Sequence, residues 1–534
     1  MLRAFTSVKH GTEKPPEPQP GLKPLPSNPL GLATSKPNQD PCPAGAPPAL
    51  RYVAAWRARD LLPGGKLVYN ERFKLDDPNA IIFVCAEDET AYRNGSKQPE
   101  PLVLRAKAGE CIHVNLYNRI PDDTVDGPVP FGGPEDSLTL KQRAQNKDAR
   151  SSWSYNMIPP IVRGFNFNQV RMSRNVALHP QLVAVNTNAS DGAHVGNNKD
   201  TTAAPCTDCR HELNVLGAGG LSELVSDPAS GLSRLKPTSY IWYAGHFSKV
   251  GKDGKAEPAE PVEFGAIALR DMADVVKHSS HGAIGSLVIE PQCSFWQEDT
   301  DVQGDSGKTA RNASATVTHW QPKKVGGTSQ CGPQPADAKR FREFVLMYQD
   351  DLSLQQNGSA LDNLRNGDDA EDSGQKAFNY RTEPLWARLG ADPGSKPDEM
   401  ANYDFSNVLS SVAHGDPATP IFTAKAGMPV RFRVVHPGGH PRNHAFSVAG
   451  HDWIINPWNC PLWPKPGDCE SNTLGWNKFS VNRIGTAGGI GPARHLNILT
   501  QAGGVFKVPG DYLYRTQEGF MFGGGLWGIF RVEP

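Results

Sequence analysis

The sequence predicts an all-β protein made of two β-sandwiches that carry long loop insertions. Segments rich in β-branched and aromatic residues recur along the chain, and each is bounded by glycine, proline or asparagine. Glycine and proline are abundant, with 53 and 47 of the 534 residues, and no long helical pattern is visible. Landmarks of the first half return in the second half, which favours two copies of one domain.

The expected strands follow one another at short intervals. In the first half they lie at 80–85, 101–121, 175–180, 239–247 and 282–291. In the second half they lie at 342–350, 421–437, 444–453, 494–504, 510–516 and 525–532. Polar stretches near 120–150 and 186–236 are longer than ordinary hairpin loops, so they are expected to be insertions.

These strands suggest a division of the chain into four sections. Residues 1–50 form a Pro-rich arm, 51–295 a first β-domain, 296–339 a connector, and 340–534 a second β-domain. The arm is aperiodic, which is typical of a linker or of a segment that lies on a partner.

Charge is balanced along the chain. Lys and Arg number 55 against 56 Asp and Glu, and no long block of one sign occurs. Nucleic acid and anionic membranes are therefore not favoured as partners. No run approaches the roughly 18 consecutive apolar residues that cross a bilayer, so no membrane span is expected.

An internal repeat supports the two-domain interpretation. "LVLRAKAGECIHVNLYN" (102–118) matches "IFTAKAGMPVRFRVVHP" (421–437), since both place Ala-Lys-Ala-Gly before a strand. "GAIGSLVIEP" (282–291) likewise matches "GLWGIFRVEP" (525–534) at the end of each half. One β-sandwich used twice is the economical explanation.

The order of motifs resembles the cupredoxin domains of the multicopper oxidase superfamily. "HAFSVAGH" at 444–451 is followed by "PGDYLY" at 509–514 and by the closing "GLWGIFRV" at 525–532. The resemblance covers about 50–295 and 340–534. Within the superfamily, the sequence is most similar to the large, divergent bacterial oxidases. It implies that both sandwiches are of the cupredoxin Greek-key type.

Laccase-type members of that family bind copper through two kinds of ligand set. H-x-H pairs hold a three-copper cluster, and a His-Cys-His set holds a blue copper, because imidazole and thiolate suit copper. By position, the resemblance retains His179, His246 and His444. It puts the other family ligand positions on Gln181, Ala244, Ser447, Ala449, Arg515, Thr516, Gln517, Met521 and Leu526.

The laccase-type centre is therefore not expected in this chain. Arg515 would place a permanent positive charge where a divalent ion should bind, and such a repulsion costs several kcal/mol at about 4 Å. Thr516 has no sulfur for a blue copper, so copper-loaded protein should be nearly colourless.

A mononuclear metal site at the end of the first sandwich is a remaining hypothesis. His278 and His281 precede the closing strand and His246 ends an earlier one, so with Asp271 or Asp274 they could hold one Cu(II) or Zn(II). Alternatively, His278 and His281 hydrogen-bond loop backbone. His179, His444 and His451 would then be packed core histidines.

Another histidine group occurs in "HPGGHPRNH" at 436–444. His436, His440 and His444 are spaced four residues apart, as in helical metal sites. The prolines and glycines between them forbid a helix. This spacing therefore does not place the three side chains on one face, and it is the weaker candidate.

The nine cysteines are an odd number, so at least one is unpaired within the chain. Cys206 and Cys209 form a CxxC with His211 just beyond, and a tight disulfide is favoured over a redox pair or half of a zinc site. Cys460 and Cys469 bracket a Pro-rich loop that a disulfide would pin. These pairs suggest an oxidising, extracytoplasmic compartment, although the opening residues show no signal-peptide pattern.

Two functional hypotheses follow. In the first, the protein is a copper-associated member of the superfamily with a reduced or displaced copper complement, and any enzymatic activity would be that of a copper-dependent oxidoreductase. In the second, it is a metal-free scaffold that binds a protein partner, forms a homo-oligomer or builds an extracellular assembly. The copper content of the purified protein distinguishes the two.

Overall fold

A computed structural model describes eleven segments of the chain. They are residues 41–121, 172–206, 237–246, 260–299, 313–325, 328–352, 354–361, 375–391, 403–439, 443–454 and 483–534. Most of the Pro-rich arm, together with Cys209, His211, His440, Cys460 and Cys469, lies outside them.

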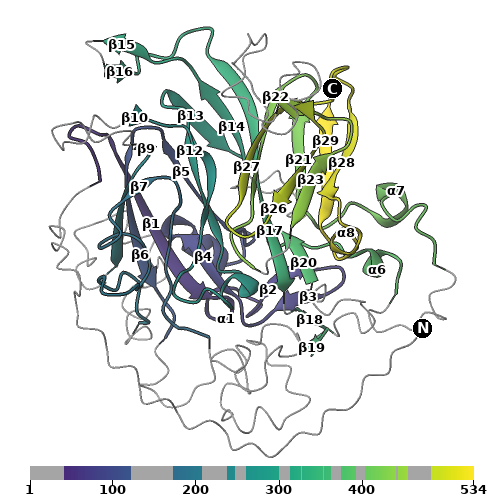
Figure 1. Ribbon diagram of the computed structural model, residues 1–534. Helices are drawn as coiled ribbons and strands as arrows, with labels where there is room; N and C mark the ends of the chain where they lie inside the picture. The colour runs from purple at the N-terminus through teal and green to yellow at the C-terminus, as the bar shows by residue number, and fades with distance from the viewer. Residues whose placement is uncertain are drawn as a thin grey trace, which may run out of the picture.

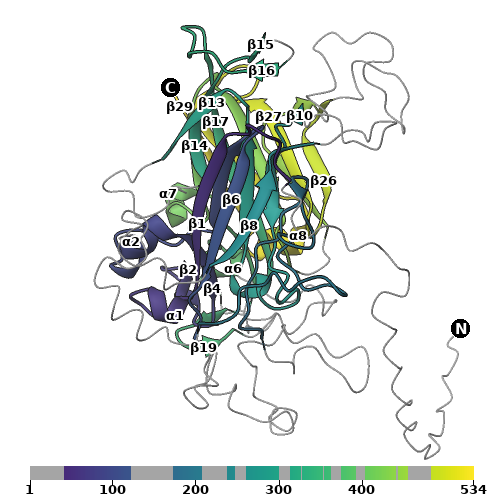
Figure 2. The ribbon, with the colours of Figure 1, turned by 90° about the vertical axis from the view of Figure 1, so that its left-hand side faces the viewer.

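Two sheets form the first sandwich, seen in purple and teal in Figure 1. The first sheet has the order β4 (Ile81–Cys85), β1 (Pro48–Arg57), β6 (Cys111–Asn118), β8 (Thr238–Tyr243) and β7 (Ala184–Val185). The second has the order β11 (Gly265–Leu269), β12 (Gly285–Glu290) and β5 (Leu102–Lys107). Figure 2 shows β1, β6 and β8 of the first sheet from its outer side.

The sheet β11-β12-β5 is buried on both faces. Ile267 and Leu287 belong to the core of the first sandwich, whereas Ala266 and Val288 belong to a second core shared with the other sandwich. Successive side chains of a strand point to opposite faces. This explains why every residue of β12 is buried.

Two larger sheets form the second sandwich, in teal, green and yellow in Figure 1. One has the order β13 (Ser294–Glu298), β14 (Ser314–His319), β17 (Lys339–Leu352), β22 (Pro429–Val435) and β27 (His495–Gln501), and β20 (Gln375–Phe378) also pairs with β17. The other has the order β21 (Ile421–Lys425), β29 (Trp527–Glu533), β28 (Gly510–Thr516), β23 (His444–Val448) and β26 (Thr486–Ile490). The stretch 296–339, where the sequence suggests a connector, contributes β14 to this sandwich.

Small elements complete the structure. A sheet of β19 (Ser359–Ala360), β18 (Gln355–Gln356), β3 (Leu75–Asp77) and β2 (Leu67–Asn70) joins the two halves. The remaining two-stranded pairs are β9 (Gly245–His246) with β10 (Glu260–Pro261), β15 (Lys323–Val325) with β16 (Thr328–Gln330), and β24 (Trp453–Ile454) with β25 (Arg483–Ile484). The helices of the described segments are α1 (Ala58–Leu61), α2 (Glu89–Arg93), α6 (Leu385–Arg388), α7 (Ser411–His414), α8 (Gly519–Gly523), and the 3₁₀ turns η1 (Ala86–Asp88) and η6 (Ser279–His281).

The strand pairing confirms the predicted fold class. β1 runs parallel to β6 as β17 does to β22, and β5 runs parallel to β12 as β21 does to β29. The antiparallel pairs β6–β8 and β11–β12 likewise correspond to β22–β27 and β28–β29. Neighbouring strands are often distant in sequence, as in Greek-key sandwiches. Among the helices of the described segments, none is long and apolar enough to cross a membrane.

Buried ion pairs cross the junction between the sandwiches. Arg105 on β5 lies 2.5 Å from a carboxyl oxygen of Glu290 on β12 and pairs with the carboxylate of Glu343 on β17. Arg433 on β22 lies 2.6 Å from Glu343. These four side chains are almost fully buried. Because a buried charge without a partner is strongly destabilising, the two sheets can pack together only if these charges are paired.

Disulfides fix two further points of the fold. Cys42 is bonded to Cys111 at the start of β6, and Cys293 is bonded to Cys331. Cys206 is also disulfide-bonded. Among the described residues Cys85 is the free cysteine, and burial raises the pKa of its thiol.

Candidate metal centre

Three buried side chains of the second sandwich meet at one point. Asp350 lies near the end of β17, His436 directly follows β22, and His444 is the first residue of β23. The Nε2 atoms of His436 and His444 each lie 2.9 Å from the same oxygen, Oδ2 of Asp350. Within the described segments, this is the only group of three metal-ligand side chains whose ligand atoms all lie within 4.8 Å of one another.

Strand pairing brings Asp350 and His436 together across a long stretch of sequence. β17 and β22 run parallel, with Met347 opposite Val435. Asp350 and His436 therefore emerge at the same end of one sheet. β23 belongs to the facing sheet, so His444 approaches the same point from across the sandwich.

An aromatic ring supports both imidazoles. The centre of the Tyr348 ring lies 4.6 Å from that of the His444 ring, and 6.0 Å from that of the His436 ring, to which it is stacked nearly parallel. Gly439, in the connection between the histidines, has a φ of 120° that favours glycine. The two imidazoles are thus held by rigid strands and a packed ring, which fixes their direction.

The three side chains of this group are shielded from water, and the group includes an ionised carboxylate. Asp350, His436 and His444 are all fully buried. Burial alone would raise the pKa of the Asp350 carboxyl, but His444 and His436 together hold it well below its usual value. The carboxylate is therefore ionised at neutral pH, and it needs a cation or a shared proton beside it.

The remaining polar atoms of these three side chains, which do not take part in the two 2.9 Å contacts, differ in their surroundings. Nδ1 of His444 lies 3.4 Å from the hydroxyl oxygen of Thr516, which in turn donates a hydrogen bond to Glu518. Oδ1 of Asp350 and Nδ1 of His436 have no hydrogen-bond partner among the described residues. The carboxylate can thus offer a second oxygen to a bound ion.

The positions that the resemblance assigns to a copper cluster do not fit one. Arg515 donates a hydrogen bond of 2.6 Å to Gln517, and Gln517 donates one to Ser447. The guanidinium of Arg515 also lies 4.6 Å above the ring of Phe522. A cation and amide groups occupy the place where several imidazoles would be needed.

His278, a residue of the mononuclear site expected in the first sandwich, has no ring nitrogen left for an ion. Its Nδ1 lies 2.7 Å from Oδ2 of Asp271, and its Nε2 lies 2.9 Å from the carbonyl oxygen of Ser173. Burial opposes the charged ring, but Asp271 outweighs it and raises the pKa of His278 to about 9. A protonated imidazole donates from both nitrogens and cannot ligate a metal.

The other expected ligands do not join His278. Nδ1 of buried His281 lies 2.7 Å from Oδ2 of Asp77, and its Nε2 has no partner among the described residues. His246 is exposed at the end of β9, opposite Glu260. Nδ1 of His179 lies 2.6 Å from the carbonyl oxygen of Asp191. The described structure therefore does not bring His246, His278 and His281 to one point.

Sequence reasoning included His444 among the metal candidates but missed Asp350. It treated His436 only through its four-residue spacing from His440 and His444, and His440 lies outside the described residues. The repeated segments 102–118 and 421–437 include "VRFRVV" but not "REFVLMYQD", so the parallel pairing of these two strands is seen only in the structure. This pairing places Asp350 and His436 at one end of the sheet.

Comparisons with known proteins add information on the fold only. No family model and no curated protein matches the sequence. A blue copper oxidase from Nitrosomonas europaea shares 11% identity at a TM-score of 0.37, covering 90% of this chain and 85% of that chain. A copper nitrite reductase from the same organism shares 10% at 0.35 (91% and 94%), and the multicopper oxidase mgLAC shares 12% at 0.36 (91% and 86%). At such identities and TM-scores nothing about copper follows for this chain, and the fold class rests on the strand pairing.

Proposed function

We propose that this protein is a cupredoxin-fold metal-binding protein that holds one copper-class ion with Asp350, His436 and His444. The observation that carries the proposal is the convergence of both Nε2 atoms on one carboxylate. This would be a displaced copper complement, in place of the centres found in laccase-type oxidases.

The donor set and its spacing support this proposal. Two neutral imidazoles and one carboxylate suit Cu(II), and also Zn(II). With metal–ligand bonds of about 2.0 to 2.1 Å, ligand atoms at right angles around an ion are about 2.9 Å apart. The two N–O distances of 2.9 Å match that spacing.

Burial points to the role of such an ion. Asp350, His436 and His444 are all closed to solvent, whereas catalytic metal sites keep a position open to water or substrate. The geometry thus favours an ion that stabilises the fold or passes electrons. An oxidoreductase activity would require a separate site for the substrate.

A metal-free scaffold is the second candidate, and one observation favours it. The same 2.9 Å distances are ordinary hydrogen-bond lengths. Protons on the two imidazoles could satisfy Asp350 without any ion. In that case the three side chains would form a buried hydrogen-bonded group that stabilises the second sandwich, and the protein would act by binding a partner.

We also infer an oxidising, extracytoplasmic location. Two disulfides, Cys42–Cys111 and Cys293–Cys331, fix the described fold, and such bonds are rare in reducing compartments. Alkylation of denatured, unreduced protein followed by mass spectrometry tests this inference. Cys85 should be labelled and those four cysteines protected; labelling of all five would contradict it.

Equilibrium dialysis with Cu(II) after chelation tests the metal proposal. The parent should bind one ion tightly, whereas Asp350→Asn and His436→Gln should bind at least tenfold more weakly. His278→Gln is the matched control, because it alters an equally buried His–Asp pair in the first sandwich. Absence of tight binding to the parent, or its loss in the control alone, would refute the proposal.

A further inference from the structure

A hollow of about 720 Å³ lies against the sheet β21-β29-β28-β23-β26, on the face that turns away from the core of the second sandwich. Phe446 on β23 and Tyr514 on β28 belong to that core. Ser447 and Arg515, the next residues along these strands, therefore point to the opposite face, and both line the hollow. This outer hollow and the candidate metal centre thus lie on opposite faces of one sheet.

Strand register places three polar side chains in one row across the outer face. Ser447 lies opposite Arg515 on one side and opposite Thr486 on the other. Directly opposite residues of neighbouring strands share a face and have Cβ atoms about 4.5 to 5.5 Å apart. Arg515, Ser447 and Thr486 can therefore contact one small ligand together.

Arg515 is held in place but keeps donors for a ligand. Its Nη2 atom donates a 2.6 Å hydrogen bond to the amide oxygen of Gln517, and its guanidinium lies 4.6 Å above the ring of Phe522. Among the described residues, its Nε and Nη1 atoms have no hydrogen-bond partner, and no carboxylate forms an ion pair with it. A guanidinium offers five N–H donors in a planar fork, which matches the two oxygens of a carboxylate.

The neighbouring side chains add neutral hydrogen-bonding groups. Gln517 donates a hydrogen bond to Oγ of Ser447, and the hydroxyl hydrogen of Ser447 has no acceptor within the described segments. Thr486 is exposed, and its hydroxyl has no partner in the same part of the chain. Because a hydroxyl both donates and accepts, these two residues suit a ligand that carries hydroxyl groups of its own.

The other ionisable side chains near the outer hollow add no second free charge. Asp452 and Arg483 pair with each other at 2.6 Å. Burial lowers the pKa of His451, so this ring is neutral at pH 7. The carboxylate of Glu518 accepts a hydrogen bond from the hydroxyl of Thr516, on the inner face of the sheet. A ligand with a single negative charge therefore fits best.

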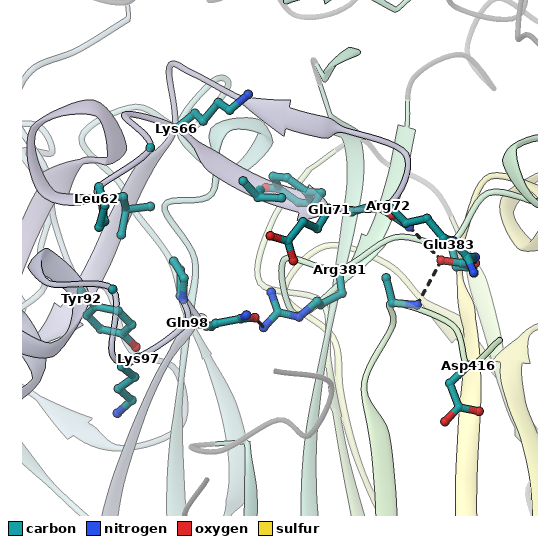
Figure 3. A pocket seen from close by; sticks show the side chains of 18 residues that line it. Leu62, Lys66, Glu71, Arg72, Tyr92, Lys97, Gln98, Arg381, Glu383 and Asp416 are labelled. Atoms are coloured by element: carbon teal, nitrogen blue, oxygen red, sulfur yellow. Dashed lines mark hydrogen bonds and ion pairs between the residues drawn. The ribbon is translucent and has the colours of Figure 1, made fainter. Parts of the chain in front are cut away.

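The cavity of about 540 Å³ between the two halves of the molecule, shown in Figure 3, differs from the outer hollow. Each cation that lines it is bound to a protein group: Arg72 to Glu383, Lys66 to Asp76, Lys97 to Asp88 and Arg381 to Gln98. An anionic ligand there would compete with these partners, whereas no described carboxylate pairs with Arg515.

We propose that the outer hollow binds a small hydroxycarboxylic acid, such as a sugar acid. The carboxylate lies on the guanidinium of Arg515, and the hydroxyls of the ligand contact Ser447 and Thr486. This binding site is separate from the candidate metal centre and does not depend on a bound ion.

Calorimetric titration of the full chain with D-glucuronate tests this proposal. The parent should bind, and Arg515→Gln should bind at least tenfold more weakly because it removes the charged fork. Arg515→Lys keeps the charge without the fork, so it should also bind more weakly than the parent. Ser447→Ala should bind about fivefold more weakly, as expected for the loss of one hydrogen bond.

Two further ligands separate the contributions of charge and hydroxyl groups. Methyl glucoside has a similar ring without the charge, and acetate has the charge without the ring. Each should bind at least tenfold more weakly than glucuronate. Acetate that binds as tightly as glucuronate would show that the hydroxyl contacts are absent and that the ligand class is wrong.

Two control variants separate this site from general effects. Arg93→Gln removes another ring-stacked arginine, which lies 5.0 Å above the ring of Trp56 in the first sandwich, and should leave glucuronate binding unchanged. Asp350→Asn should also retain binding, which keeps the result independent of the metal proposal. The inference is wrong if the parent does not bind glucuronate at millimolar concentration, if methyl glucoside binds equally well, or if Arg515→Gln binds like the parent.

Discussion

The hydroxyl oxygen of Thr516 lies 3.4 Å from Nδ1 of His444. The sequence resemblance predicts that position 516 corresponds to the cysteine whose thiolate binds blue copper in laccase-type oxidases. Here an alcohol takes that place, and the other ring nitrogen of His444 faces Asp350. One imidazole thus contacts a supporting hydroxyl on one side and the candidate metal position on the other, as metal-ligating histidines commonly do.

Copper-loaded protein should show only weak visible absorption. Intense blue colour arises from charge transfer between thiolate and Cu(II), and Thr516 cannot supply it. Optical spectra after copper loading check this. A strong visible band that disappears in Cys85→Ser would contradict it, since Cys85 is the free cysteine of the described segments.

Replacing Thr516 by Ala should weaken copper binding by about tenfold, because groups that orient a ligand commonly contribute 10- to 100-fold to affinity. Thr516→Ser keeps the hydroxyl and should bind like the parent. Competition titration with a copper chelator measures the difference. Equal affinities of the Ala and Ser variants would show that the contact to His444 has no orienting role.

Glu290 should make stability depend on pH. Burial and the nearby charge of Glu343 raise the pKa of Glu290 from its ordinary value of 4.5 to about 8. The folded protein then binds a proton that the unfolded chain releases, so stability should fall as pH rises from about 4.5 to about 8. Urea unfolding of the parent and of Glu290→Gln across this range measures the effect.

The Glu290→Gln variant should show a flatter pH dependence, because glutamine mimics the protonated acid and does not titrate. Glu89→Gln is the control, since Glu89 is another buried glutamate that pairs with an arginine. It should keep the slope of the parent. If the free energy of unfolding changes with pH equally in the parent and in Glu290→Gln, Glu290 is not the cause of the pH dependence.

His278→Gln should destabilise the fold without changing copper content. Breaking a buried ion pair by removing one partner costs about 3 kcal/mol or more. Since Asp271 raises the pKa of His278 to about 9 against an ordinary 6.5, this stabilisation should be complete below pH 6.5 and lost as pH rises through 9. Thermal unfolding with parallel copper analysis would contradict the account if copper were lost instead of stability.

The fold was predictable because its determinants are local or repeated. Ala-Lys-Ala-Gly recurs at 106–109 and 424–427, and each copy joins two strands with the same pairing in both sandwiches. Turn residues and β-branched runs mark these strands directly. Such signals do not depend on distant partners.

The candidate site was only partly predictable, because it depends on pairing between distant strands. Asp350 is 86 residues from His436 and 94 from His444, and nothing in its local sequence marks it as a ligand. For His278 the sequence showed a histidine just before the closing strand, with Asp271 nearby in sequence, whereas the structure buries it in an ion pair with Asp271. Burial and charge partners decide whether a histidine can ligate, and neither is visible in local spacing.

Anomalous diffraction from copper-loaded crystals, recorded at the copper absorption edge, tests the central claim most directly. The account predicts a strong peak bounded by Oδ2 of Asp350 and the Nε2 atoms of His436 and His444, at about 2.0 to 2.1 Å from each. The peak should be absent from crystals of Asp350→Asn. A copper peak at His278 and His281, or no peak with the Asp350 group intact, would contradict the account.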